Sequence, residues 1–176
     1  VKIYLSYDPT IKFSFINGDY SSFSRMISNL INNAVEASKG QKKVVNIKFR
    51  TDDNNAIIDI SDSGEGMSSE MVEKIRSNMP LDSSKKEGCG LGLQQAMETV
   101  RIYNGKLEVT SEKGQGTTLR IIFPLSKPPK WVSTHISLHK DNIVMVFDKN
   151  ISIHNIWTRL LNKYSGELKL KFFKDA

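Results

Sequence analysis

The chain has 176 residues, 39% hydrophobic and 25% charged, which is typical of one globular domain or of one domain followed by part of another. Its single cysteine, Cys89, excludes an internal disulfide and a cysteine-rich zinc site, and it indicates a reducing compartment. No apolar run reaches the roughly 18 residues of a membrane span, and the first residues do not resemble a signal peptide. The net charge of +6 lies mostly beyond Lys127 and forms no basic run, so nucleic-acid binding is not expected.

Hydrophobic periodicity predicts strands and helices along most of the chain, because strands repeat every two residues and helices every 3.6. In chain order the expected elements are strands at 2–7 and 11–16, a helix at 20–38, strands at 44–50 and 56–61, a short helix beginning after Ser68 or Ser69, a long loop at 77–90, a helix at 91–103, and strands at 106–111 and 117–123.

The chain is expected to divide into a domain at 1–127, a linker at 128–130 and a second segment at 131–176. The reason is a group of three prolines, of which the first, Pro124, is expected to end the last strand because proline has no backbone N–H. In the second segment the pattern predicts a strand at 143–148, a helix carrying the apolar residues from Ile153 to Tyr164, and a strand at 168–173.

A polar stripe runs along the long predicted helix. Asn29, Asn33 and Glu36 are spaced i, i+4 and i+7, so they share one side of the helix next to its apolar face. Taken alone, the stripe is typical of an ordinary polar helix edge. The amide oxygens are also neutral, hard ligands suited to Mg²⁺, which takes most of its other ligands from water and phosphates.

Two glycine-rich stretches follow. The first, Asp62-Ser63-Gly64-Glu65-Gly66, places a carboxylate at a strand end before glycines that allow a backbone to approach a flat ligand closely. A carboxylate there can accept a hydrogen bond from an exocyclic amine such as that of adenine, although a plain glycine-rich turn would give the same pattern. The second, residues 88–92, leads into a predicted helix after Lys85 and Lys86, an arrangement suited to phosphate or simply to a flexible helix entry.

The four motifs occur in the order seen in one known family. Residues 29–34, Asn-Leu-Ile-Asn-Asn-Ala, resemble the N box of sensor histidine kinases, and residues 62–66 and 88–92 resemble the two glycine boxes. Gly114-Gln115-Gly116-Thr117 resembles the last motif of the same ATP-binding catalytic domain, which belongs to a superfamily with gyrase, mismatch-repair ATPases and a heat-shock chaperone. The resemblance covers residues 1–127 and implies a two-layer α/β sandwich, a mixed sheet with helices on one face.

The resemblance implies a role for individual residues in binding ATP and Mg²⁺. Asn33 would be the metal ligand, and Asn29 would lie near the phosphates and a metal-bound water. The residues implied to surround the triphosphate are Gly88, Gly90, Leu91, Gly92 and Leu93, with Lys85 or Lys86 as the cation. Asn29, Asn33, Lys85 and Lys86 are therefore the expected catalytic residues, because phosphoryl transfer depends on positioning and charge neutralisation.

The base would be bound at the other end of the site. Asp62 would accept a hydrogen bond from the adenine amine, and the remaining residues implied to line this part are Gly64, Gly66, Met67 and Thr117. One departure from the family is Glu36, which lies where many of these kinases carry a lysine directed toward the phosphates.

The implied function is transfer of the γ-phosphoryl group of ATP to a histidine on a separate dimerisation hairpin. His135, His139 and His154 all lie beyond the motifs and outside any such hairpin, so the acceptor is expected elsewhere in the parent protein. The resemblance also implies a homodimeric parent, a cognate response regulator as partner, and a cytoplasmic location for this domain, whether or not the parent is anchored in a membrane.

Two other functions are compatible with the motifs. One is an ATP-hydrolysing enzyme of the gyrase or chaperone type, in which the resemblance implies a water-activating Glu at position 29. An amide cannot take a proton, so Asn29 disfavours hydrolysis. The other is a module that senses ATP without transferring its phosphate.

The second segment, 131–176, resembles the first third of a response-regulator receiver domain. A working receiver holds Mg²⁺ with a cluster of acids at the end of its first strand, whereas here Asp148 is followed by Lys149 and Asn150. We therefore expect this segment to accept no phosphoryl group. A plain strand-helix-strand extension of the kinase domain is the alternative.

Overall fold

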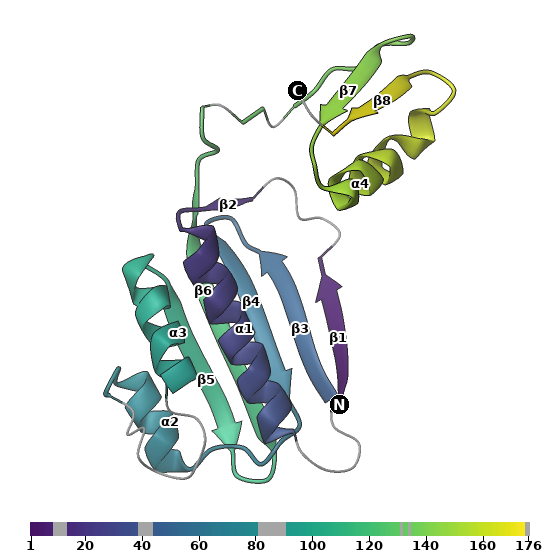
Figure 1. Cartoon of the computed structure of the whole chain (residues 1–176). Helices are drawn as coiled ribbons and strands as arrows, with labels where there is room; N and C mark the ends of the chain where they lie inside the picture. The colour runs from purple at the N-terminus through teal and green to yellow at the C-terminus, as the bar shows by residue number, and fades with distance from the viewer. Residues whose placement is uncertain (9–13, 39–43, 81–90, 131, 134, 175–176) are drawn as a thin grey trace. The chain divides into compact units, whose positions relative to one another are not determined.

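The structure is a computed structural model that describes residues 1–8, 14–38, 44–80, 91–130, 132–133 and 135–174 (Figure 1). The chain divides into two compact units, Val1–Lys130 and Trp131–Ala176. Within the described residues, no helix combines the length and the apolar character needed to cross a membrane. Because the positions of the two units relative to one another are not determined, each unit is described separately.

The first unit is built on a mixed sheet. Its strands are β1 (Lys2–Tyr7), β2 (Phe15–Ile16), β3 (Val44–Thr51), β4 (Asn55–Asp62), β5 (Lys106–Glu112) and β6 (Gly116–Ser126). They lie in the order β1-β3-β4-β6-β2, with β5 also paired to β6. Only β1 and β3 are parallel; the other pairs are antiparallel. The predicted strands are thus confirmed in type, although residues 11–13 of the second one lie outside the described residues.

Strand β6 corrects one expectation, because it continues through Pro124 to Ser126. The N–H of Leu125 donates to the carbonyl of Asn54, at 2.7 Å, on the β4 side. Successive backbone N–H groups of a strand point to opposite edges, so the nitrogen of Pro124 faces the edge shared by β5 and β2. Along that edge of β6, β5 pairs as far as Ile122 and β2 pairs from Leu125 onward. Pro124 therefore faces no strand that would need a hydrogen-bond donor.

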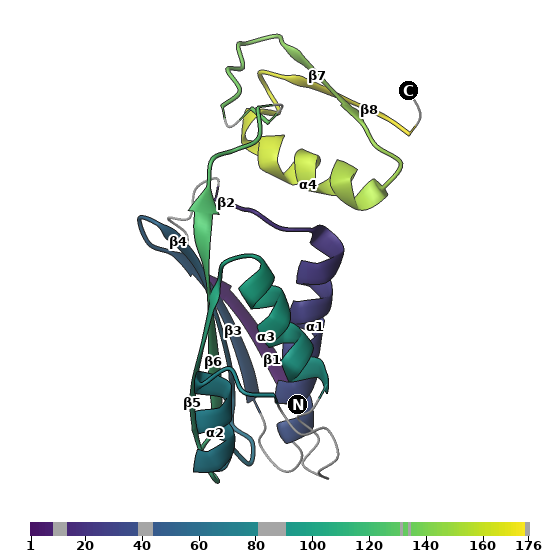
Figure 2. The ribbon, with the colours of Figure 1, turned by 90° about the vertical axis from the view of Figure 1, so that its left-hand side faces the viewer.

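Three helices lie over one face of the sheet: α1 (Tyr20–Ala37), α2 (Ser69–Arg76) and α3 (Leu91–Ile102). Figure 2 shows the sheet nearly edge-on with α1 and α3 on the same side of it. This arrangement is the two-layer α/β sandwich expected from the motifs, with helices on one face of a mixed sheet. Helix α1 ends at Ala37, one residue before the predicted end at Ser38.

The apolar stripes of the helices and the inward-facing residues of the strands form one core. Its largest fully buried side chains are Phe123, Met26, Leu30, Ile60, Leu93, Ile121 and Val45. On α1 the buried residues Met26, Leu30 and Ala34 repeat every four residues, as the helical period requires. The same stripe sets the direction of Asn33, which precedes Ala34 and therefore lies at the margin of the core.

Helix α1 begins after Asp19, whose side chain accepts hydrogen bonds from the backbone N–H groups of Ser21 (3.2 Å) and Ser22 (2.7 Å). These groups would otherwise lack a partner at a helix start, so Asp19 acts as the N-cap. Hydrogen bonds from Ser22 and then Ser21 lower the pKa of Asp19 well below its ordinary value of 3.8.

We expect Asp19 to contribute stability above pH 4 and to lose this contribution in acid. A folded-state pKa below the unfolded one favours the folded state when the group is ionised, so the benefit falls as pH falls below 3.8 toward the folded value. Urea unfolding of the wild type and of Asp19→Asn, which keeps an oxygen acceptor but does not titrate, measures this. The difference between the two proteins should be constant above pH 4 and shrink below it; a constant difference down to pH 2 would contradict it.

The second unit contains β7 (Ile143–Phe147), α4 (Ile151–Leu161), a 3-10 turn η1 (Asn162–Tyr164) and β8 (Lys169–Phe173). β7 and β8 are parallel, so α4 is the crossover of a strand-helix-strand unit, as the sequence predicted. Asn150 caps α4 by accepting from the N–H of Ser152 at 2.9 Å. Among the described residues of this unit, Phe147 stacks on Phe173 and His154 stacks on Phe172, each pair with ring centroids 4.8 Å apart.

Candidate functional site

A cavity of about 40 Å³ lies where the helix layer of the first unit meets the sheet. Its apolar wall comes from α1, β4, α3 and β6 and consists of Leu30, Ala34, Ala37, Ile60, Leu93 and Leu119. Its polar lining consists of Asn33, Asp62 and Thr117, and the loop after β4 completes it with Gly66 and Met67. Apolar walls with a few convergent polar groups are typical of a small-molecule site.

Asn33 is the most unusual polar group in this cavity. Its amide nitrogen is buried and has no hydrogen-bond partner within the described part of the chain. A buried amide N–H₂ without an acceptor costs roughly 1 to 3 kcal/mol, so such a group calls for a partner such as a bound water or a ligand. The side chain therefore fits a ligand with acceptor atoms, such as phosphate oxygens, while its oxygen remains suited to Mg²⁺.

Asn29 lies one helical turn before Asn33 and contacts the beginning of α3. Its amide N–H donates to the side-chain oxygen of Gln95 at 3.2 Å. A Cβ placed on Gly92 would lie 3.5 Å from the Cβ of Asn29 and 3.6 Å from the amide oxygen of Asn33. Helix α3 thus brings a glycine of the second glycine box directly against the asparagine stripe of α1.

Asp62, at the end of β4, lies in the wall of the cavity. One of its carboxylate oxygens accepts from the N–H of Gly64 at 2.8 Å, which fixes the direction of the side chain. Gly64 itself is buried beneath the end of α1, where a Cβ would overlap the carbonyl of Ala37. Gly64 therefore allows the loop to pass under α1 and does not line this cavity, whereas Gly66 does.

Two further glycines allow the loop after β4 to contact the hairpin between β5 and β6. Gly66 has φ +68°, and a Cβ on it would overlap the carbonyl oxygen of Glu112. Gly116 has φ +88°, and a Cβ on it would overlap the carbonyl oxygen of Asp62. Both positions thus combine a left-handed backbone with a close approach, and only glycine satisfies both conditions.

The described part of the structure does not place the remaining expected site residues in the cavity. Leu91 is the exposed first residue of α3 and does not line the cavity. Lys85, Lys86, Gly88 and Gly90 lie outside the described residues. The sequence did not single out Gln95 or Ser111, because neither belongs to a motif; Gln95 contacts Asn29, and Ser111 contacts both Met67 and Thr117. No signal short of the tertiary contacts would have found them.

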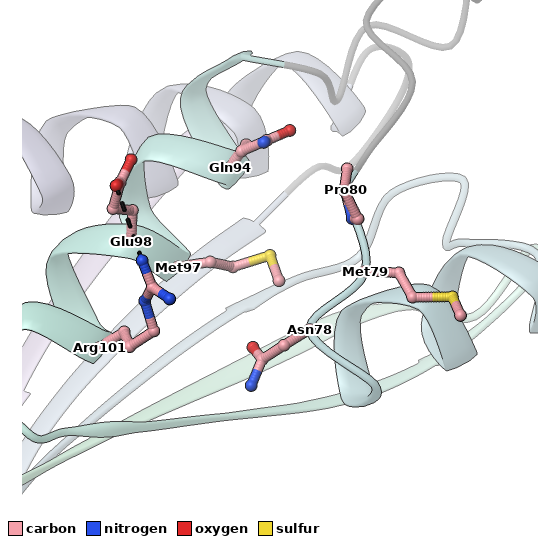
Figure 3. Close-up of a pocket in the computed structure, with 7 residues that line it drawn as sticks. All are labelled: Asn78, Met79, Pro80, Gln94, Met97, Glu98 and Arg101. Atoms are coloured by element: carbon pink, nitrogen blue, oxygen red, sulfur yellow. Dashed lines mark ion pairs between the residues drawn. The ribbon is translucent and has the colours of Figure 1, made fainter.

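A second cavity, of about 210 Å³, lies between the segment after α2 and the outer side of α3 (Figure 3). It is lined by Asn78, Met79, Pro80, Gln94, Met97, Glu98 and Arg101. Glu98 and Arg101 form an exposed ion pair at 3.8 Å on its rim, as the dashed line shows. None of its described lining residues is among those expected to bind a ligand, so the smaller cavity is the candidate site.

The two-layer fold, the asparagine stripe of α1 and the glycine-lined cavity all lie within the first unit. Residues 18–127 match the family described as Histidine kinase-, DNA gyrase B-, and HSP90-like ATPase, and the chain belongs to this family. All the described residues that line the cavity lie within the matched range.

The relatives of this chain include kinases of bacteria. It is 34% identical over 111 residues to Sporulation kinase C of Bacillus subtilis (strain 168), covering 62% of this chain and 25% of that protein. The fold is similar to the catalytic domain of histidine kinase ThkA, with a TM-score of 0.58 and 22% identity over 70% of this chain and 78% of that one. It is also similar to the mycobacterial sensor histidine kinase MprB, with a TM-score of 0.57 and 23% identity over 70% and 81%. The chain thus spans about a quarter of the length of the curated relative.

Proposed function

We propose that this chain is the catalytic, ATP-binding part of a two-component sensor histidine kinase. In this proposal it binds Mg²⁺ and ATP in the small cavity and transfers the γ-phosphoryl group to a histidine on a separate dimerisation hairpin. The observation that carries the proposal is the buried amide nitrogen of Asn33, which has no hydrogen-bond partner among the described residues and lines one cavity with Asp62 and Thr117, inside the range that matches the family.

The polar groups of the cavity suit the two ends of ATP. Asp62 offers a carboxylate to the amine of adenine, and the apolar side chains around it suit a flat ring. Asn33 would hold Mg²⁺ through its oxygen, and its N–H₂ would donate to a phosphate or a bound water. The metal neutralises charge on the phosphates, which is the main electrostatic requirement of phosphoryl transfer. The proposed roles of Lys85, Lys86, Gly88 and Gly90 toward the phosphates rest on the motif alone.

The competing function is ATP hydrolysis. Activating a water requires a group that accepts a proton, and the amide of Asn29 accepts none. The hydrogen bond of Asn29 to Gln95 further assigns this amide to a positioning role between α1 and α3. We therefore favour transfer to a histidine over transfer to water.

Phosphotransfer to a supplied acceptor tests the proposal. The chain is mixed with radiolabelled ATP, Mg²⁺ and a purified dimerisation hairpin that carries the phosphoacceptor histidine. We expect label on the hairpin, none when its histidine is replaced by glutamine, and little release of inorganic phosphate. Phosphate release without labelled hairpin would support hydrolysis, and ATP binding without either product would support a sensing module.

Asn33→Ala is expected to remove most of the Mg²⁺ dependence of ATP binding, because Mg²⁺ takes few ligands from the protein and this change removes one of them. Calorimetric titration of ATP with and without Mg²⁺ measures the dependence in each protein. Asn32→Ala is the matched control, since Asn32 is the adjacent amide on α1 but is exposed and lies outside the cavity. An unchanged metal dependence in Asn33→Ala would refute the proposed ligand.

The parent protein is proposed to be a homodimer that carries the histidine hairpin, works in the cytoplasm and passes its phosphoryl group to a cognate response regulator. The basis is the resemblance of this chain to bacterial kinases such as Sporulation kinase C, of which the matched region covers 25%. No nucleic-acid partner is proposed.

For the second unit we propose a receiver-like strand-helix-strand fragment that does not accept a phosphoryl group. The parallel pairing of β7 and β8 around α4 supports the receiver-like arrangement. Asp148 follows β7, and one of its oxygens already accepts from the N–H of Asn150 at 2.8 Å. Among the described residues, no three acidic, histidine or cysteine side chains gather as a metal site would require.

A further inference from the structure

Ser111, on β5, contacts two residues that line the candidate site and one further residue of β6. Its hydroxyl oxygen accepts from the N–H of Met67 at 2.8 Å, lies 2.9 Å from the carbonyl oxygen of Gly116, and lies 2.9 Å from the hydroxyl oxygen of Thr117. Met67 and Thr117 line the cavity, but Ser111 does not. It therefore acts on the cavity through its neighbours.

Counting hydrogens decides the direction of each of these bonds. A serine hydroxyl has one hydrogen to donate and two lone pairs to accept with. The carbonyl of Gly116 can only accept, so it takes the hydrogen of Ser111. The N–H of Met67 can only donate, so it occupies one lone pair. The second lone pair then faces Thr117, which must be the donor in the bond between the two hydroxyls.

This arrangement restricts the hydrogen bonding of Thr117, which is 6% exposed and lines the cavity. Its hydroxyl also has a single hydrogen, and that hydrogen is directed at Ser111. Toward a ligand, whether directly or through a water, the oxygen of Thr117 can therefore only accept. A carboxylate at Asp62 is likewise an acceptor, so both polar groups at the base end of the cavity call for donors.

We propose that Ser111 is a positioning residue for base selectivity, because it holds Thr117 as an acceptor. The favoured ligands are purine nucleotides with an exocyclic amine at position 6, which supplies two N–H donors. Nucleotides with a carbonyl at that position present an acceptor to two acceptors, which leaves buried groups without partners. This inference rests on the proposed function, since it assumes that an adenine nucleotide binds in this cavity.

The test compares ADP with IDP, which differ at position 6 of the base, where ADP has an amine and IDP a carbonyl. Calorimetry gives the ratio of their dissociation constants for the wild type and for Ser111→Ala. We expect the wild type to prefer ADP by about tenfold or more, the effect of losing one charge-assisted hydrogen bond. In Ser111→Ala the hydrogen of Thr117 is released and can serve the carbonyl of IDP, so the ratio should fall at least about threefold.

A purely structural role for Ser111 would weaken both nucleotides alike and leave the ratio unchanged, which would overturn the inference. In a Thr117→Val background, Ser111→Ala should no longer change the ratio, because no hydroxyl remains to be redirected. If the alanine variant does not fold, Ser111→Cys replaces it, since a thiol fills the space but accepts hydrogen bonds poorly. Ser111→Thr keeps the hydroxyl and should keep the wild-type ratio.

The outcomes separate the inference from the function on which it rests. No binding of ADP by the folded wild type would overturn both. Binding of ADP with equal affinity for IDP would leave the kinase proposal in place but reject both Asp62 and Thr117 as acceptors that select the base. Binding with the expected preference, but with the same preference in Ser111→Ala and Ser111→Cys, would reject the role of Ser111 alone.

Discussion

Asp62→Ala is expected to weaken ADP binding by about tenfold or more. The substitution removes a carboxylate that lines the cavity and, in the proposed complex, accepts from the adenine amine. A hydrogen bond to a charged group contributes about 1.5 to 3 kcal/mol, which corresponds to roughly 10- to 150-fold in affinity. Calorimetric titration with ADP measures the change. The same carboxylate should make the wild type prefer ATP to GTP, because the guanine carbonyl would face it.

Asp59→Ala is the matched control for this experiment. Asp59 is on the same strand, three residues before Asp62, and its carboxylate is paired with Arg120 at 2.6 Å and Arg50 at 3.4 Å. It does not line the cavity, so its removal should lower stability but leave the affinity for ADP unchanged. Equal losses of affinity in the two variants, or equal affinities of the wild type for ATP and GTP, would reject Asp62 as the base-reading residue.

Gly116→Ala is expected to destabilise the first unit more than other glycine substitutions in its hairpin. Gly116 has φ +88°, and the added Cβ would overlap the carbonyl oxygen of Asp62, which belongs to the neighbouring strand backbone. Because a backbone atom cannot swing aside as a flexible side chain can, β4 and β6 would have to separate. We expect a loss of about 4 kcal/mol or more, a large part of the stability of a domain of this size.

Gly114→Ala separates the cost of the left-handed backbone from the cost of the close contact between the Cβ and the carbonyl oxygen. Gly114 lies two residues earlier in the same hairpin and has a similar φ of +84°, but a Cβ on it would meet nothing within 4 Å. Its substitution therefore carries only the cost of a left-handed backbone, about 1 to 2 kcal/mol. Urea unfolding of both variants gives the difference, which measures the close approach of β6 to Asp62. Similar losses in both variants would show that backbone conformation alone makes Gly116 necessary.

The secondary structure of this protein could be predicted from its sequence almost completely. The hydrophobic periods of 2 and 3.6 residues depend on neighbours along the chain, so the local sequence is enough to predict each strand and helix. The strand through Pro124 is the exception. Whether a proline interrupts a sheet depends on what lies beside its nitrogen, and here the gap between β5 and β2 removes the need for a donor.

The candidate site was predictable in outline for the same reason. Asn29 and Asn33 share one side of α1 because the helix repeats, and Asp62 lies at the end of its strand because the hydrophobic alternation stops there. The order of the four motifs then indicated the family to which the chain belongs. These features are local in sequence, or depend only on the order of local features.

By itself, then, the sequence determined the elements, the family and the polar residues of the cavity. The tertiary structure decided which glycines are required by close backbone approach, and it showed that Gln95 contacts Asn29 and that Ser111 contacts Met67 and Thr117. Ser111 lies 44 residues from Met67 along the chain. Contacts of this kind arise from the pairing of strands and the packing of helices, and no local hydrophobic period or sequence motif predicts them.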